Sequence, residues 1–315
     1  MDELHLTASH DVRHWEGEYA QPHWYSRVLT TGDVLVWKPD GTPLLCVLRQ
    51  AITGRAYAQT YSAVAPLARS SPRHNRGLAA GKIQDHDASA LFVGGVPKGG
   101  HIGKKSATRY QPIKRDGTLS KTVYAKDSPS FVLGFADRSA RFPYCRQTAY
   151  TARHPATTGM LLPMLCQLTA LFAAVLPARH AAQAAVVAQT EPAFVFPGTV
   201  FTTVTVNRNW QTACHTDQGD LAAGFGVMLC LRSGEYTGGL YVMPGFDIAV
   251  DLQAGDVIFS NVHEYHGNTA LVGDARRYER ITLVCYYREA MVDCQSPAAE
   301  LARAQQLAHR RAYAS

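Results

Sequence analysis

Hydrophobic residues gather in three kinds of segment along the chain, and these predict three kinds of element. Two short runs near the N-terminus, DVLVWK and LLCVLR, flank the turn sequence PDGTP and predict a β-hairpin. The most apolar run, MLLPMLCQLTALFAAVL from Met160, predicts a buried helix, and the alanine-rich ARHAAQAAVVAQ predicts a second helix. Short β-rich segments follow: TVFTTVTV, GVMLCLR, GGLYVMP, DIAVDL, DVIFS and ITLVCYYR. Gly, Pro and Asp separate them at short intervals, which is typical of an antiparallel sandwich or barrel.

The order of these segments predicts a single α+β domain over residues 1–315. An N-terminal region at 1–155 comes first, the supporting helices are expected at 157–190, and the β core is expected at 199–288. The final segment, SPAAELARAQQLAHRRAYA, begins with Ser and Pro in N-cap and first-turn positions and predicts a C-terminal helix over 296–314. No stretch rich in Gly, Ser or Pro suggests a linker.

Composition and cysteine use predict an ordinary globular protein of a reducing compartment. Hydrophobic residues make up 46% and charged residues 18% of the chain. The seven cysteines are scattered and form no C-x-x-C pair, so we expect neither a disulfide framework nor a zinc ribbon. The N-terminus does not have the pattern of a signal peptide, and Pro163, Gln167 and Thr169 interrupt the run from Met160. We therefore expect an intracellular protein without a membrane span.

Positive charge is concentrated in one segment of a chain whose formal net charge is +6. Residues 97–127 have the composition of a loop, and before Asp127 only Asp116 opposes their basic side chains. These are Lys98, Lys104, Lys105, Arg109, Lys114, Arg115, Lys121 and Lys126. One interpretation is a solvated basic loop. The other is a surface that grips nucleic acid, because clustered Lys and Arg neutralise phosphates and release counterions.

A histidine and a carboxylate follow the run TVFTTVTV, in the segment CHTDQGD. His215 and Asp217 are two residues apart at a strand end, so the alternation of side chains points them the same way, with Cys214 on the opposite, core-facing side. An antiparallel return through GDVIFSNVHEYHGN brings a second histidine, His266, alongside them; His263 competes for this place. Two histidines and one carboxylate are the set preferred by non-haem Fe(II), and zinc is the alternative metal.

Such an iron site leaves coordination positions open for a co-substrate. A dicarboxylic keto acid would chelate the metal, and its far carboxylate would need a guanidinium group. The segment RRYERITLVCYYR offers Arg280 at the start of the last strand, with Thr282 on the same strand face. Arg276 and Arg277 precede the strand and are expected in a loop.

Five motifs occur in sequence order: NRGLAAG from Asn75, GFADRSARFPYCRQTAYT from Gly134, TVNRNWQTACHTDQGD from Thr205, SNVHEYHGN from Ser260 and RIT from Arg280. Together they resemble the 2-oxoglutarate and Fe(II)-dependent dioxygenases, and more narrowly their TET/JBP branch. The H-x-D, H and R-x-T pattern indicates only the superfamily, whereas NRG and the DRS to PYCR segment point to the branch. The resemblance implies a double-stranded β-helix (jelly-roll) core flanked by helices. It also implies hydroxylation of the 5-methyl group of a pyrimidine in DNA.

The resemblance implies roles for the residues of this chain that match the motifs. His215, Asp217 and His266 would bind Fe(II), and Arg280 with Thr282 would bind 2-oxoglutarate. His215, Asp217, His266 and Arg280 would form the catalytic centre.

Two further residues receive roles from the same resemblance. Arg208 is expected to touch the co-substrate as well. Asp220 falls where the family places a polar residue against a flipped pyrimidine. A carboxylate accepts a hydrogen bond from the N4 amine of cytosine but meets only another acceptor at O4 of thymine, which favours 5-methylcytosine. The alternative for Asp220 is a turn-stabilising role after Gly219.

The DNA side of the cavity is expected to include residues from the first half of the chain: Asn75, Arg76, Asp137, Arg138, Lys104 and Lys105. A base must leave the stack before its methyl group can react, so both a basic surface and a close-fitting pocket are needed. The alternative for the NRG and DRS motifs is a glycine-assisted turn and an ordinary ion pair at a strand end.

Other functions remain open from the sequence. An enzyme on the same iron core could act on thymine or an N-methyl base, or could use ascorbate in place of 2-oxoglutarate. A catalytically idle DNA-binding module and a sugar-binding or metal-storing cupin-like jelly roll are the alternatives of other classes. The expected partner is DNA containing 5-methylcytosine, with no membrane and no obligate protein partner, in the nucleus if the source is eukaryotic.

Overall fold

The computed structural model describes residues 1–70, 74–83, 102–114 and 116–313. Its largest element is a sheet of mostly antiparallel strands drawn from both halves of the chain. In spatial order the strands are β1 (Asp2–His5), β3 (Val34–Trp37), β4 (Pro43–Leu48), β17 (Val257–Ser260), β13 (Gly226–Ser233), β20 (Glu279–Tyr286), β12 (Thr203–Arg208), β10 (Ser130–Ala136) and β11 (Arg146–Gln147). The predicted N-terminal hairpin is confirmed as β3 and β4, which pair antiparallel. The sheet thus also takes strands from outside residues 199–288.

A second, smaller sheet faces the first. Its strands are β18 (Gly267–Asn268), β15 (Tyr241–Met243), β16 (Ile248–Val250) and β2 (Arg27–Leu29), and a separate pair joins β14 (Thr237–Gly238) to β19 (Leu271–Val272). Buried side chains of the large sheet, including Val36 and Cys230, form one apolar cluster with Met243 and Ile248 of the small sheet. Two sheets packed on a shared core, with helices outside, form the jelly-roll arrangement that the sequence predicts.

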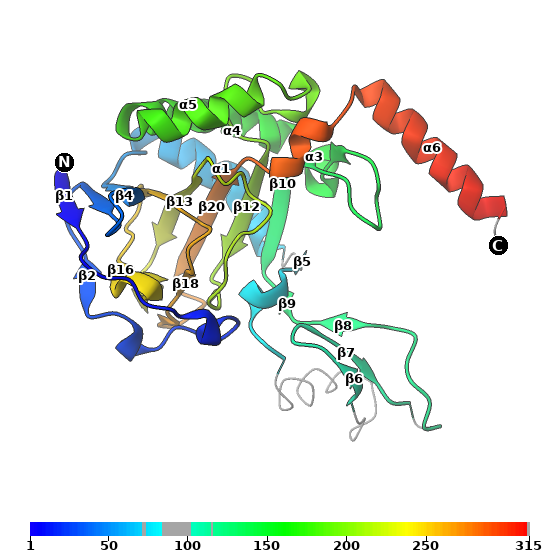
Figure 1. Ribbon diagram of the computed structural model, residues 1–315, viewed down its shortest axis with the longest axis horizontal. Helices are drawn as coiled ribbons and strands as arrows, with labels where there is room; N and C mark the ends of the chain where they lie inside the picture. Colours follow the sequence, from blue (N-terminus) through cyan, green and yellow to red (C-terminus); the bar gives the residue numbers. More distant parts are fainter. Residues whose placement is uncertain (71–73, 84–101, 115, 314–315) are drawn as a thin grey trace.

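Helices cover the outer face of the large sheet (Figure 1). They are α1 (Gly54–Arg69), α3 (Ala149–Arg153), α4 (Pro155–Val175) and α5 (Pro177–Val187). The helices expected from the apolar and alanine-rich runs are therefore confirmed as α4 and α5, whereas the sequence reading did not identify α1. Within the described residues, α4 is the one helix long and apolar enough by composition to cross a membrane.

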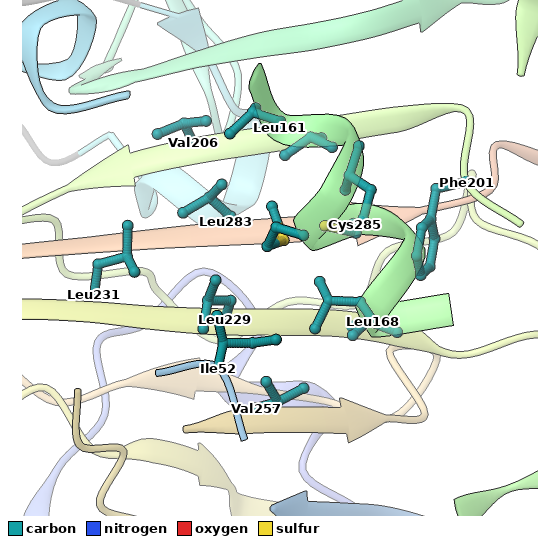
Figure 2. Close-up of a cluster of buried hydrophobic side chains, with 14 of the residues drawn as sticks. Ile52, Leu161, Leu168, Phe201, Val206, Leu229, Leu231, Val257, Leu283 and Cys285 are labelled. Carbon is teal, nitrogen blue, oxygen red and sulfur yellow. The ribbon is translucent and has the colours of Figure 1, made fainter. Parts of the chain in front are cut away.

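The inner face of α4 packs on the sheet (Figure 2). Leu161 and Leu168 of this helix are fully buried in the same cluster as Leu229 of β13 and Leu283 of β20. Burying a leucine side chain stabilises the fold by about 1.5–3 kcal/mol. The helix layer therefore holds β13 and β20 in place, and β20 carries several of the functional residues described below.

The basic segment is a small sheet and not a loop. β6 (Ile102–Lys105), β7 (Arg109–Pro112) and β8 (Tyr124–Ala125) pair antiparallel, and they connect to the body through β9 (Asp127–Ser128), which pairs with β5 (His74–Asn75). Composition concealed these strands because they are short and rich in Lys, Arg and Gln, whereas Tyr110 packs with Ile83 and stacks on Tyr124. Residues 97–101 lie outside the described residues. We call residues 102–125 the basic arm.

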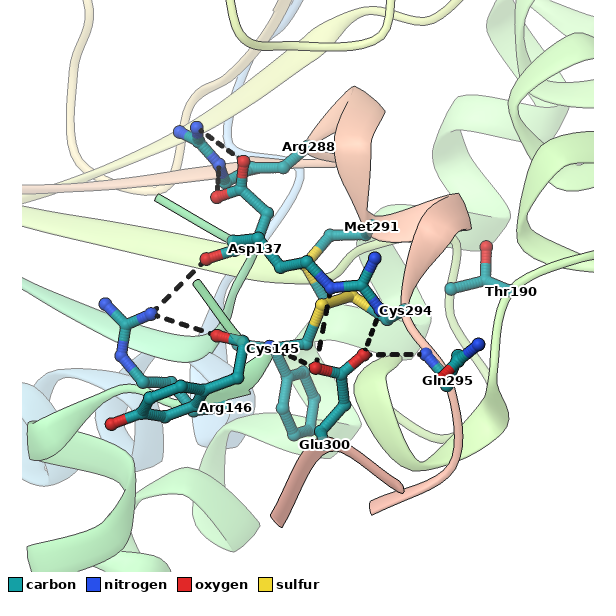
Figure 3. Close-up of a disulfide and its surroundings, with 12 residues drawn as sticks. Asp137, Cys145, Arg146, Thr190, Arg288, Met291, Cys294, Gln295 and Glu300 are labelled. Carbon is teal, nitrogen blue, oxygen red and sulfur yellow. Dashed lines mark hydrogen bonds and ion pairs between the residues drawn. A yellow bond between two sulfur atoms is a disulfide. The ribbon is translucent and has the colours of Figure 1, made fainter. Parts of the chain in front are cut away.

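One disulfide, between Cys145 and Cys294, is present, although the cysteine spacing indicates no disulfide framework (Figure 3). The two residues are 149 positions apart, and only the fold brings the segment after β10 beside the segment after β20. No local spacing in the sequence could reveal this pair. A disulfide removes the reason for expecting a reducing compartment. The other five cysteines are free, and Cys214 is buried as the alternation predicts.

The predicted C-terminal helix is α6 (Pro297–Tyr313), which extends away from the body (Figure 1). Its first turn is fixed by Glu300, which is buried and forms an ion pair with Arg138. The Glu300 carboxylate also accepts hydrogen bonds from the backbone N–H groups of Cys145 and Gln295. The helix start is therefore attached to the disulfide region (Figure 3).

Candidate metal centre and substrate cavity

Two histidines and one aspartate converge on a single point between the sheets. The candidate ligand atoms of His215, Asp217 and His266 all lie within 4.8 Å of one another. Asp217 Oδ1 is 3.5 Å from His215 Nε2, and Asp217 Oδ2 is 3.6 Å from His266 Nε2. The structure therefore brings together the three residues that the sequence singles out, with His266 and not His263 in the third place.

The backbone explains why these side chains meet. His215 and His266 form an antiparallel bridge in which each N–H donates to the other's carbonyl oxygen at 2.9 Å. Each imidazole Nδ1 lies within hydrogen-bond distance of a carbonyl oxygen two residues earlier, that of Ala213 for His215 and that of Glu264 for His266. An Nδ1–H group donating to a carbonyl oxygen leaves Nε2 with its lone pair, which is the form that binds a metal.

The charges of the three residues depend on one another. Burial works against the protonated form of His215, yet the hydrogen bond and negative charge of Asp217 raise its pKa above the ordinary value. Burial also works against ionisation of Asp217, but hydrogen bonds from both histidines hold its pKa well below the usual range. The centre thus keeps the half-buried Asp217 carboxylate ionised, which favours a cation between the three side chains.

The centre opens into a cavity of about 530 Å³ between the sheets. Alternating residues of two neighbouring strands form one wall: Thr205 and Asn207 on β12, and Arg280, Thr282, Val284 and Tyr286 on β20. This is the period-two alternation that the sequence reading applied to Arg280 and Thr282. The cavity has the size of a site for a small ligand together with a nucleobase.

One end of the cavity holds a buried cation. Arg280 is only 6% exposed, and its guanidinium group has no hydrogen-bond or ion-pair partner among the described residues. Gly239 lies beside it: a Cβ at this glycine would lie 3.4 Å from Arg280 Cδ and Nε and only 2.7 Å from Leu271 Cδ2, and its φ of +68° favours glycine. A buried, unpaired guanidinium requires an anion, and a carboxylate fits its two-pronged geometry.

Arg208 does not reach this end, so the expected contact with the co-substrate is contradicted. Its Nε donates to the Glu279 carboxylate at 2.6 Å, and the side chain does not line the cavity. Glu279 also binds Arg69 of α1. The sequence could not show that Arg208 forms an ion pair with Glu279 of the adjacent strand, because this pairing depends on the register of β12 and β20.

Asp220 lies at the other end of the cavity and is 7% exposed. Burial and the neighbouring charge of Asp217 raise the pKa of Asp220 well above its usual value. Arg76 and Arg288 also line this end, and Arg288 passes close to Gly219, where a Cβ would lie 3.2 Å from its Nη2. A buried acidic group flanked by two cations offers both donors and acceptors to a polar ligand.

The other expected DNA-side residues lie in several places. Asp137 does not line the cavity; its carboxylate binds Arg288 Nε at 2.8 Å and so holds a residue that does (Figure 3). Arg138 is turned away and pairs with Glu300. Asn75 lies in β5, and its side chain is outside the described part of the chain. Lys104 and Lys105 lie in β6, and their side chains are likewise not described.

Sequence reasoning missed several residues that line the cavity. His74, Asn207, Tyr241 and Tyr286 all face it. The ring of Tyr241 stacks on that of His266 at 5.5 Å between centroids, and its hydroxyl donates to Ser260. Strand alternation counted from Arg280 could have identified Tyr286. The same alternation along β12 puts Asn207 and Arg208 on opposite faces of the strand. No such pattern points to His74.

The residues fit the groups that the motifs imply. Two imidazole nitrogens and one carboxylate, with their outer partners in place, are a donor set suited to Fe(II). The unpaired Arg280 guanidinium in the same cavity suits a carboxylate-bearing co-substrate such as 2-oxoglutarate.

Comparison with known proteins agrees with this chemistry. Residues 134–289 match the model of the TET/JBP oxygenase domain of the 2OGFeDO superfamily. The chain is 32% identical to thymine dioxygenase JBP1-B of Trypanosoma cruzi (strain CL Brener), over 66% of this chain and 26% of that protein. It is 34% identical to the bifunctional helicase and thymine dioxygenase JBP2 of Leishmania infantum, over 47% of this chain and 13% of that protein. The matches therefore span about a quarter or less of the length of these relatives.

A solved structure shares the fold. The chain superposes on NgTET1 in complex with 5mC DNA with a TM-score of 0.52 and 12% sequence identity, covering 88% of this chain and 90% of that chain. The jelly-roll expectation is thereby confirmed.

Proposed function

The chain belongs to the TET/JBP family of 2-oxoglutarate and Fe(II)-dependent oxygenases through residues 134–289, and on this premise we propose that it oxidises the 5-methyl group of a pyrimidine in DNA. One observation carries the proposal. A His-Asp-His centre, a buried unpaired guanidinium and a buried carboxyl group line the same cavity of about 530 Å³. The three groups supply a metal site, a co-substrate site and a base-recognition site.

The protein's part in the reaction is to bind and orient. His215, Asp217 and His266 would hold Fe(II), and Arg280 with Thr282 would hold the far carboxylate of 2-oxoglutarate. Bound Fe(II) with 2-oxoglutarate and O2 supplies the oxidation, which yields succinate and CO2 and adds one oxygen atom to the methyl group. The enclosing sheets limit the access of water to this space.

Asp220 would recognise the base. We propose 5-methylcytosine as the substrate, because the Asp220 carboxyl group can accept a hydrogen bond from the N4 amine. The base must be turned out of the duplex to reach it. The basic arm would grip the flanking phosphates through exposed side chains such as Arg109, Lys114 and Lys121.

Thymine is the second candidate substrate. The curated relatives that match this chain at 31–34% identity are named thymine dioxygenases. Asp220 argues against thymine only while its carboxyl group acts as an acceptor, since O4 of thymine needs a donor.

The test is a product assay on two duplexes of the same sequence, one with 5-methylcytosine and one with cytosine at the same sites. Both contain thymine, so digestion to nucleosides and mass spectrometry detect oxidation of either base in one reaction. The proposal expects hydroxylated 5-methylcytosine that depends on Fe(II) and 2-oxoglutarate. Oxidised thymine in both duplexes would identify thymine and not 5-methylcytosine as the substrate. A product formed with ascorbate alone would identify ascorbate and not 2-oxoglutarate as the co-substrate. A chain that binds both duplexes and oxidises neither would be an idle DNA-binding module.

A further inference from the structure

Asn207 is a cavity residue with an incomplete set of hydrogen bonds. It lies in β12 directly opposite Thr282 of β20, and both side chains line the cavity near Arg280. Its amide Nδ2 donates to Thr282 Oγ1 at 3.5 Å. Its carbonyl Oδ1 is buried and has no hydrogen-bond partner in the described part of the protein. A buried acceptor without a donor destabilises a fold, so an occupied cavity should supply one.

The hydrogen bond from the Asn207 amide determines where the hydroxyl proton of Thr282 can point. A hydroxyl group has one proton, and when its oxygen accepts from the Asn207 amide the proton must point elsewhere. Thr282 is 3% exposed and makes no other hydrogen bond through its side chain among the described residues. The proton is therefore free to donate into the cavity, on the side of the carboxylate that Arg280 would bind.

The unpaired carbonyl oxygen of Asn207 is the other feature of this arrangement. A dicarboxylic keto acid offers only acceptors at neutral pH, so it cannot satisfy Asn207 Oδ1 directly. One water molecule can, because it has two protons and can donate one to Oδ1 and the other to a carboxylate oxygen. Arg280, the Thr282 hydroxyl and this water would then give the carboxylate a full set of donors.

We propose that Asn207 is a positioning residue that determines the affinity of the cavity for an acceptor-only dicarboxylate: it orients the Thr282 hydroxyl proton and binds the carboxylate through one water. The inference deepens the co-substrate assignment and rests on the proposed function. It concerns binding before any oxidation and requires no DNA.

The test measures 2-oxoglutarate binding by calorimetry on the full chain loaded with Mn(II), which replaces Fe(II) without turnover. Asn207→Asp keeps the shape but removes the Nδ2 donor and adds a negative charge, so the affinity should fall by about tenfold or more. The affinity should fall less in Asn207→Ala, and the loss in Thr282→Val should be about the same as in Asn207→Ala. If the two residues act as a unit, the double variant Asn207→Ala/Thr282→Val should lose less than the product of the single losses.

Two controls separate this role from a general loss of structure. Mn(II) affinity should stay the same in all variants, because neither residue belongs to the metal centre, and unchanged Mn(II) affinity shows that the fold around the cavity is intact. Thr31→Val, at an exposed threonine between β2 and β3 that does not line the cavity, should keep the wild-type affinity for 2-oxoglutarate.

The outcomes are distinguishable from those of the proposed function. Two results would overturn this inference and leave the proposed function intact. One is an affinity of Asn207→Asp for 2-oxoglutarate within twofold of the wild type. The other is a double variant whose loss equals the product of the two single losses. A wild-type protein that binds Mn(II) but no 2-oxoglutarate would overturn the inference together with the co-substrate assignment.

Discussion

At the scale of single residues, the candidate metal centre depends on backbone carbonyl groups as much as on its ligands. The Ala213 and Glu264 carbonyl oxygens lie 2.8 and 3.0 Å from the two Nδ1 atoms, so both imidazoles are held by the chain around them. Asp217 is held in turn, because its N–H donates to the Val262 carbonyl oxygen. The three candidate ligands are thereby oriented by the chain itself.

Metal binding should stabilise the folded protein through these residues. A cation that binds only the native state raises the melting temperature with its concentration, since stabilisation grows as RT ln(1 + [L]/Kd). We expect Fe(II) under anaerobic conditions, or Mn(II), to raise the melting temperature of the wild type. His215→Ala should abolish this rise, whereas His263→Ala, outside the centre, should keep it; an equal rise in all three proteins would contradict the assignment.

Asp220 should control the choice of base. An amide in place of the carboxyl group can donate to O4 of thymine as well as accept from N4 of cytosine. Asp220→Asn should therefore lower the preference for 5-methylcytosine over thymine by about tenfold or more, measured as the ratio of kcat/KM values on matched duplexes. A ratio that does not change would assign Asp220 to the turn after Gly219 and not to base recognition.

The residues of the candidate metal centre could be predicted from the sequence, because short spacing and the alternation of side chains along a strand relate their positions. The H-x-D spacing and strand alternation placed His215 and Asp217 together, and the antiparallel return brought His266. Arg208 could not be assigned correctly, because Glu279 takes it up from the adjacent strand. Asn207 was overlooked for the related reason that its partner, Thr282, lies 75 residues away.

At the scale of elements, Glu279 connects three of them. Its carboxylate accepts from Arg69 and Tyr61 of α1 and from Arg208 of β12, while its own backbone begins β20. The residue next to it is Arg280, so this cluster fixes the start of the strand that carries the candidate co-substrate site.

The cluster should make stability depend on acid pH. Burial raises the pKa of Glu279, but hydrogen bonds from Arg69, Tyr61 and Arg208 outweigh it and lower the pKa from 4.5 to about 2. The stabilisation is therefore complete above pH 4.5 and is lost as the pH falls towards 2. Glu279→Gln, which cannot ionise, should be less stable than wild type at neutral pH, and the difference should shrink across this window in urea unfolding. A constant difference would contradict the account.

The disulfide should stabilise the end of the cavity near Arg288 (Figure 3). It joins the segment after β10 to η6 (Glu289–Asp293) and its C-terminal neighbour, over a long loop whose closure restricts the unfolded chain. Reduction, or Cys145→Ser, should lower the free energy of unfolding by about 2–4 kcal/mol. Cys166→Ser, which removes an exposed free thiol, is the matched control and should change little. Seven free thiols in the native, unreduced protein would contradict the bond.

Elements with strong local patterns were predicted and the others were not. The β3–β4 hairpin, α4 and α5 followed from hydrophobic runs and turn residues. The basic arm was taken for a loop because its strands are short and largely polar, and pairing between β6, β7 and β8 rather than burial defines them. The inclusion of β10 in the large sheet depends on long-range pairing with β12, which no local pattern encodes.

At the scale of the whole molecule, one cavity between the two sheets holds the candidate metal centre, the buried Arg280 guanidinium group and the buried Asp220 carboxyl group. β20 passes along the whole cavity, from Arg280 to Tyr286, and Arg288 follows it. The helices on the outer face pack against this strand. The basic arm leaves the body through β9, which pairs with β5, and the cavity residues His74 and Arg76 lie in and directly after β5. A DNA strand bound by the arm would thus lie near the end of the cavity that holds Arg76 and Asp220.

The central claim is that this cavity couples 2-oxoglutarate decarboxylation to oxidation of a 5-methylpyrimidine in DNA. The most direct measurement quantifies succinate and oxidised nucleoside in the same reaction, with methylated duplex, Fe(II), O2 and 2-oxoglutarate. The account predicts one succinate for each oxygen atom added to the base, and the loss of both products in His215→Ala. Oxidised base without succinate, or no oxidised base from a protein that binds Fe(II), 2-oxoglutarate and DNA, would contradict it.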